Sequence, residues 1–118
     1  RSVRERAFTA AQADRGERDY GRECARCNGA DLSGDPASEV PALAGDHFLE
    51  QWNGRSVKDL FDVIKRSMPS DAPDSLTTRA YTDIVAYLLS ANGFASGAEE
   101  LPRPPDRLQE WVLEKAQH

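Results

Sequence analysis

The stretch from which the rest of the chain is best interpreted is Cys24-Ala25-Arg26-Cys27-Asn28-Gly29. It holds the only two cysteines among the 118 residues, and two positions separate them. This spacing occurs in thiol redox motifs, in zinc sites and in motifs that attach a cofactor through its cysteines. The residue after the second cysteine, Asn28, and the pattern of the surrounding chain help to choose among these classes.

The composition limits the class of protein. The net charge is −5 at pH 7, so the chain lacks the basic excess that a nucleic-acid-binding protein needs. No apolar run approaches the length of about 18 residues that a membrane-spanning helix requires, so we expect no span. The length suits one domain with a modest core. The chain starts with Arg1 rather than methionine, so we expect a processed or trimmed chain that has lost an export signal.

The residues before the cysteines predict a helix. Thr9 and Gln12 have the spacing of a capping box with Thr9 as N-cap, and the helix is expected over about residues 10–23. Gly16 and Tyr20 lie four positions apart on one face. A glycine inside a helix costs about 1 kcal/mol relative to alanine. Close approach of a second helix is one reason to keep Gly16, and a tolerated surface glycine is the alternative.

Three further helical patterns follow, separated by loops rich in glycine and proline. We expect a short helix over residues 46–53, a second from Ser56 that ends before Pro69, and a third from Thr77 or Thr78 to Asn92. Their apolar positions recur at helical spacing: Phe48 and Trp52 in the first, Val57, Leu60, Phe61 and Ile64 in the second, and Tyr81, Ile84, Val85 and Leu88 in the third.

The two ends carry weaker signals. Residues 1–8 are polar and show no pattern. At the other end, Asp106 is expected to cap an amphipathic helix that presents Leu108, Trp111 and Val112 on one face. The predicted organisation is therefore a domain over residues 1–101 and a C-terminal extension over residues 102–118.

No strand pattern is present, so the predicted fold class is all-α, with four to five short helices and long loops. The lack of a βαβ pattern disfavours a thioredoxin-like oxidoreductase. A zinc site is disfavoured because His47 and His118 are not spaced as zinc ligands relative to the cysteines.

Taken in order, these pieces resemble a class I c-type cytochrome domain, and most closely the cytochrome c subunits or domains that serve bacterial periplasmic dehydrogenases. Each piece alone has low specificity, and the resemblance rests on the order in which they occur. Residues 102–118 lie outside the resemblance. The matching pieces are Cys24-Ala-Arg-Cys27, Gly29-Ala-Asp-Leu-Ser-Gly34, Pro41-Ala-Leu-Ala-Gly45, Trp52-Asn-Gly-Arg55, Met68-Pro69, and Asp83-Ile-Val-Ala-Tyr-Leu88 followed by Asn92-Gly-Phe94.

The resemblance implies a cytochrome c-like fold with one haem c, attached covalently through Cys24 and Cys27, and with Met68 as an axial ligand of the iron. It also implies that the first and last helices cross near the haem. By the same resemblance, the carbonyl of Pro41 would orient the proximal ligand, and Leu43 would pack on the haem. Trp52 and Arg55 would reach the haem propionates, with core packing as the alternative for Trp52. The positions at the helix crossing would be Gly16, Tyr20, Ile84 and Tyr87.

Asn28 departs from the family pattern. In the haem-attachment motif a histidine follows Cys-x-x-Cys, and an amide oxygen is a poor, neutral substitute for its imidazole. In one interpretation haem is attached, Met68 or a substitute ligates the iron, and Asn28, water or nothing occupies the proximal side. In the other, the domain has lost its haem, and Cys24 and Cys27 form a disulfide or free thiols. The alternative for Met68 is a plain apolar loop residue. His47 is a candidate replacement ligand, with a surface histidine as the alternative.

The function expected from this resemblance is electron transfer by a domain that is not itself an enzyme. Its partner would be a redox protein such as a periplasmic dehydrogenase or oxidase, and the chain would be exported to the periplasm. The alternative is a haem-free, cytochrome-like subunit that holds a complex together.

Overall fold

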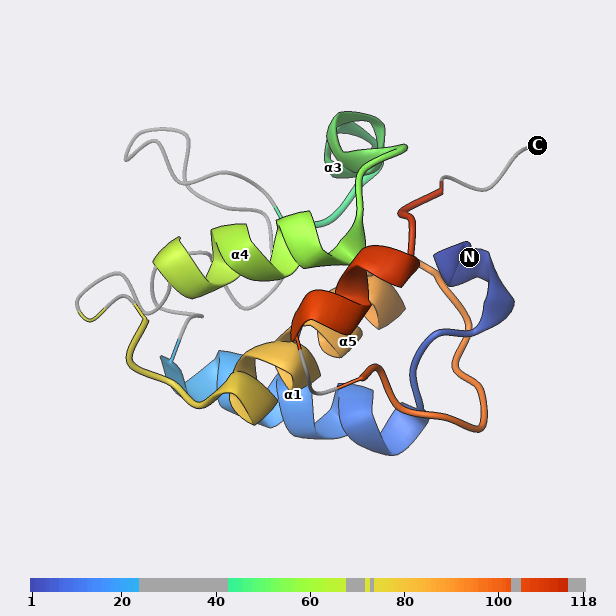
Figure 1. The fold of residues 1–118 in the computed structure, drawn as a ribbon. Helices are drawn as coiled ribbons and strands as arrows, with labels where there is room; N and C mark the ends of the chain where they lie inside the picture. The colour runs from blue at the N-terminus through green and yellow to red at the C-terminus, as the bar shows by residue number, and fades with distance from the viewer. Residues whose placement is uncertain (24–42, 68–71, 73, 103–104, 115–118) are drawn as a thin grey trace.

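Four α-helices and two short 3-10 helices form the part of the chain that the computed structural model describes, which comprises residues 1–23, 43–67, 72, 74–102 and 105–114. Within these residues two isolated β-bridges occur and no strand, so the expected all-α fold is confirmed (Figure 1). In chain order the elements are η1 (Val3–Glu5), α1 (Ala10–Glu23), α3 (Asp46–Trp52), α4 (Val57–Ser67), α5 (Thr78–Ala91) and η3 (Pro105–Glu110).

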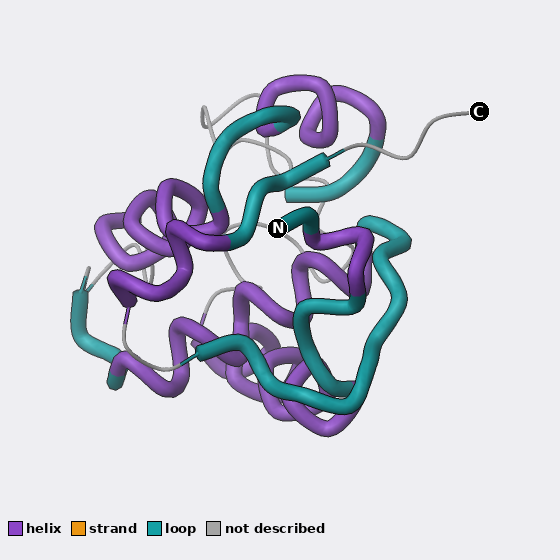
Figure 2. The backbone as a smooth tube through the Cα atoms, turned by 45° about the vertical axis from the view of Figure 1, so that its right-hand side comes forward, coloured by secondary structure: helices purple, strands orange, loops and turns teal. Residues whose placement is uncertain are grey.

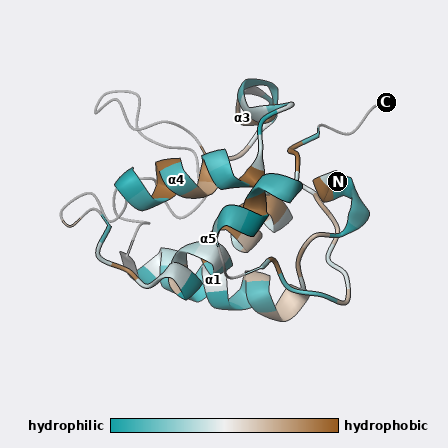
Figure 3. Cartoon of the chain, in the orientation of Figure 1, coloured by the Kyte–Doolittle hydropathy of each residue, from teal (hydrophilic) through white to brown (hydrophobic). Residues whose placement is uncertain are grey.

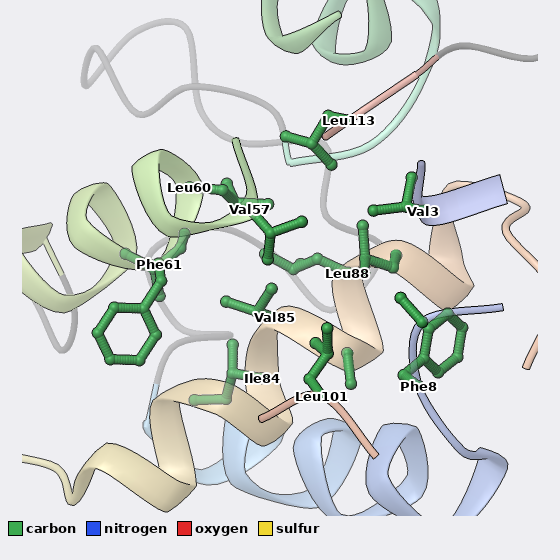
Figure 4. Packing of buried hydrophobic residues seen from close by; sticks show 14 of the residues in the cluster. Val3, Phe8, Val57, Leu60, Phe61, Ile84, Val85, Leu88, Leu101 and Leu113 are labelled. Atoms are coloured by element: carbon green, nitrogen blue, oxygen red, sulfur yellow. The ribbon is translucent and has the colours of Figure 1, made fainter. Parts of the chain in front are cut away.

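Helix α5 lies at the centre of the molecule, between α1 and α4 (Figure 1). Eight of its residues are buried, and six of these are apolar, as expected for a helix at the centre of the core. In Figure 4, Val57 and Leu60 of α4 share one core with Val85 and Leu88 of α5. Figure 3 shows that α4 mixes hydrophilic and hydrophobic residues along its length, as expected for a helix with one face in the core.

The crossing of α1 and α5 depends on Gly16. A Cβ atom added at Gly16 would lie 1.8 Å from the carbonyl oxygen of Asp83 and 2.9 Å from the backbone nitrogen of Ile84. The backbones therefore approach more closely than any side chain at position 16 allows. The prediction that Gly16 serves a helix crossing is confirmed.

The N-terminal residues, for which the sequence predicted no element, are ordered by a capping box. The Ser2 side chain accepts a hydrogen bond from the backbone N–H of Arg4, and the Glu5 carboxylate accepts one from the backbone N–H of Ser2. This turn directs Val3 and Phe8 into the core, where both are fully buried. Residues 1–8 contribute only three apolar side chains to the core, which is too few for a helical or strand periodicity to be recognised in the sequence.

Residues 111–113, the C-terminal segment, run between the N-terminus and the start of α4 (Figure 2). The N–H of Val3 donates to the carbonyl of Val112 at 3.0 Å, and the N–H of Val57 donates to that of Trp111 at 2.8 Å. The element before this segment is the 3-10 helix η3 and not the amphipathic helix predicted from Asp106. Leu108 and Trp111 are nonetheless buried, because they pack against the core from successive short elements.

The predicted helix starts are largely confirmed. The hydroxyl groups of Thr9, Ser56 and Thr77 each accept a backbone hydrogen bond at the start of α1, α4 and α5. Gln12 differs from its predicted role in a capping box, because its buried amide pairs with the backbone N–H and carbonyl of Leu101 instead. Among the described helices, none is both long enough and apolar enough to cross a membrane.

Candidate functional site

Two described helices end directly before the segments that carry the predicted attachment and ligand residues. Helix α1 ends at Glu23, immediately before Cys24, and helix α4 ends at Ser67, immediately before Met68. Both C-terminal ends lie on the left of Figure 1. The two helices therefore end on the same side of the molecule, which suits a group held by residues that follow both of them in sequence.

Five of the predicted site residues lie outside the residues that the structure describes, and for them the sequence predictions stay predictions. These residues are Cys24, Cys27, Asn28, Pro41 and Met68. His47 lies on α3, but its side chain is outside the described part, so its role as a replacement ligand also stays a prediction. Within the described residues, no group of three His, Cys, Asp or Glu side chains is placed to hold a metal ion.

Two aromatic rings flank the helix crossing next to the cysteine segment. The ring of Tyr20, one turn before Cys24 on α1, lies 5.6 Å from the ring of Tyr87 on α5. Tyr20 is buried, whereas Tyr87 is half-buried, and this burial raises the pKa of the Tyr87 phenol, with a smaller contribution from Glu17. The sequence predicted that these two tyrosines form the crossing together with Gly16 and Ile84, and the structure brings the four positions together.

The segment that follows residues 24–42 is fastened to the end of α5 by Asn92. The Asn92 side-chain amide donates to the carbonyl of Leu43 at 3.0 Å, and its oxygen accepts from the N–H of Gly45 at 3.0 Å. Leu43 is thereby held in the core with 7% of its surface exposed. Asn92 was interpreted from sequence only as a helix stop. Its side chain reaches across 49 positions in the chain, a contact that no local pattern signals.

Trp52 and Arg55 lie together at the end of α3. The guanidinium carbon of Arg55 is 4.2 Å from the centre of the Trp52 ring, and Arg55 also approaches Asp59 on α4 at 3.7 Å. Trp52 is buried and packs against the ring of Phe48, whereas the Arg55 side chain is about half exposed. The structure therefore groups the two predicted propionate-binding positions and shows that Trp52 also has a core-packing role.

A family model described as "Cytochrome C oxidase, cbb3-type, subunit III" matches residues 11–88, about two thirds of the chain. The chain belongs to this family. The cbb3-type subunit III match begins within α1, includes the Cys24–Cys27 and Met68 segments and ends within α5. It makes the chain a c-type cytochrome domain, for which electron transfer through covalently bound haem c is the family function. No match was found among curated proteins or among solved structures.

Proposed function

We propose that this chain is an electron-transfer domain that carries one haem c and serves an exported redox enzyme in the periplasm. The observation that carries the proposal is the family match across the two-cysteine motif. Two thiols at this spacing suit attachment of one porphyrin, and the chain has no further cysteine for a second. The thioether of Met68 is a ligand type that haem iron accepts in cytochromes c. The two thiols therefore suit attachment of the porphyrin, and the Met68 thioether suits ligation of the iron from one side.

When bound, haem supplies reversible one-electron oxidation and reduction at its iron. The work of the chain is to bind, orient and bury the group. Cys24 and Cys27 would hold it covalently at the end of α1, while Met68 would approach from the end of α4. The buried Leu43, positioned by Asn92, would exclude water from one side. Arg55, stacked on Trp52, would pair with a propionate, because its guanidinium is charged at every physiological pH.

Asn28 supports a second candidate, a haem-free interaction subunit. The sequence places an amide where the family motif carries an imidazole, and neutral amides are absent from the usual ligands of haem iron. In this alternative the helical core built on the α1–α5 crossing would keep the fold without the cofactor, and the partner surface would be the functional part.

The first prediction separates these two candidates. Protein expressed with its cytochrome c maturation machinery should be red, and its Soret band should stay with the polypeptide after denaturation, because thioether bonds survive unfolding. The double variant Cys24→Ser/Cys27→Ser should lose the bound band completely. Colourless wild-type protein from a host that matures a control cytochrome c would contradict the haem proposal and favour the interaction subunit.

The second prediction concerns ligation. If Asn28 leaves the proximal side without a strong ligand, the iron should be partly high-spin, and Asn28→His should convert it to a low-spin spectrum. His47→Ala is the companion variant, since His47 is the candidate substitute. A wild-type low-spin spectrum that Asn28→His leaves unchanged, and that His47→Ala turns high-spin, would show instead that His47 already ligates the iron.

A further inference from the structure

A hollow of about 450 Å³ is lined by residues of α1 and by residues from the start of α5. Four of its lining residues are arginines and two are aspartates, so the lining is positive although the chain carries a net charge of −5. The lining residues are Arg15, Arg18, Asp19 and Arg22 of α1, Thr77 at the N-cap of α5, and Arg79, Ala80 and Asp83 of α5.

One carboxylate, that of Asp83, lies close to two of these arginines, which come from different helices. Asp83 has only 5% of its side chain exposed, and its oxygens lie 3.2 and 3.4 Å from Nε and Nη2 of Arg15. The same carboxylate lies 3.9 Å from Nε of Arg79. Nη2 of Arg15 also donates to a carboxylate oxygen of Glu100 at 2.6 Å. Hydrogen bonds to Asp83 and then to Glu100 raise the pKa of Arg15 above its usual value. The Arg15 guanidinium is thus held in place before any ligand arrives, whereas the exposed Arg79 lies near the same carboxylate without a hydrogen bond to it.

The hollow has more hydrogen-bond donors than its own carboxylates can accept. A guanidinium carries several N–H groups in a planar fork that matches the oxygens of a phosphate or carboxylate. Arg22 pairs with Asp19, and Arg18 is exposed on the same side of α1. The first turn of α5 adds the positive end of a helix dipole to the lining. A ligand with several oxygens and more than one negative charge suits this arrangement better than a single carboxylate does.

We propose that this hollow is a binding site for a phosphate group, either free or carried on a small molecule. Its lining includes none of the predicted haem ligands, and the proposal does not depend on the electron-transfer proposal. A phosphate bound there would bridge α1 to α5, because Arg15 and Arg79 belong to different helices. It would therefore stabilise the helix crossing next to the cysteine segment.

The test is calorimetric titration of the 118-residue chain with orthophosphate, pyrophosphate and adenosine diphosphate at constant ionic strength. We expect pyrophosphate to bind, and Arg79→Gln to weaken it about tenfold, the loss that follows from removing one charged hydrogen-bond donor. The matched control is Arg66→Gln on α4, which removes one exposed positive charge away from the hollow. Binding of orthophosphate as well would indicate free phosphate, and preference for adenosine diphosphate would indicate a phosphate on an organic group.

Two outcomes would overturn the proposal. Equal weakening by Arg79→Gln and Arg66→Gln would mean that only overall charge matters. Absence of binding by all three phosphates, with binding of a hexaglutamate peptide, would mean that the hollow accepts an acidic protein segment. Melting temperatures show whether Arg79→Gln is folded. If it is not, Arg18→Gln takes its place in the comparison, because Arg18 is exposed.

Discussion

Replacing Gly16 with alanine is expected to lower the free energy of unfolding by about 3 kcal/mol or more, at the upper end of the cost of overpacking a core. The added methyl carbon would lie 1.8 Å from the carbonyl oxygen of Asp83 and 2.4 Å from its carbonyl carbon. Both are backbone atoms inside α5, so no side-chain rotation can relieve the clash. The two helices would have to separate, and the Tyr20–Tyr87 ring contact would be weakened with them.

Gly21 provides a matched control on the same helix. It is exposed, and a Cβ atom added there would meet no atom within 4 Å apart from its own helix backbone. Gly21→Ala should therefore stabilise the protein by about 0.5 to 1 kcal/mol through helix propensity alone. Urea denaturation followed by circular dichroism measures both variants against the wild type. If Gly16→Ala shifted the midpoint in the same direction as Gly21→Ala, the close crossing of α1 and α5 would be wrong.

Deleting residues 108–118 is expected to remove most of the stability of the fold. Leu108, Trp111 and Leu113 are each at most 5% exposed, and truncating even one buried leucine or tryptophan costs about 2 to 5 kcal/mol. The deletion also removes the hydrogen-bond partners of the Val3 and Val57 backbone N–H groups. A small domain has only about 5 to 15 kcal/mol of stability to lose.

Deletion of residues 115–118 is the control, since it leaves all these contacts in place. The measurement is the melting temperature of both truncated chains, with the haem content recorded in parallel. Equal melting temperatures for the two truncations would show that the C-terminal segment contributes nothing to the core.

Helices whose signals are local could be predicted from the sequence. The starts of α1, α4 and α5 follow from Thr9, Ser56 and Thr77, because a hydroxyl side chain caps the backbone within three residues. Gly16 was predictable for a related reason, since an unfavourable residue inside a helix requires a compensating contact.

Contacts between distant residues could not be predicted. Gln12 has a spacing from Thr9 that indicates a capping box, yet its amide binds Leu101, 89 positions away. Asn92 likewise binds Leu43 and Gly45, which its place at a helix end does not reveal. For the candidate site, the sequence named Leu43, Trp52 and Arg55, and the structure places Trp52 and Arg55 in contact. The arginine-lined hollow was missed because its residues come from two helices.

The meeting of residues 1–3 with residues 111–113 also makes completion of the fold depend on both ends of the chain. The amino group of Arg1 binds the carbonyl of Glu110, a contact between residues 109 positions apart. During synthesis the N-terminal residues leave the ribosome long before their partners, and such long-range contacts are slow to form. Until α5 has also emerged, α1 lacks the helix that packs against it. If the thiols of Cys24 and Cys27 are modified before the two ends of the chain meet, the modifying enzyme acts on a chain whose long-range contacts have not yet formed.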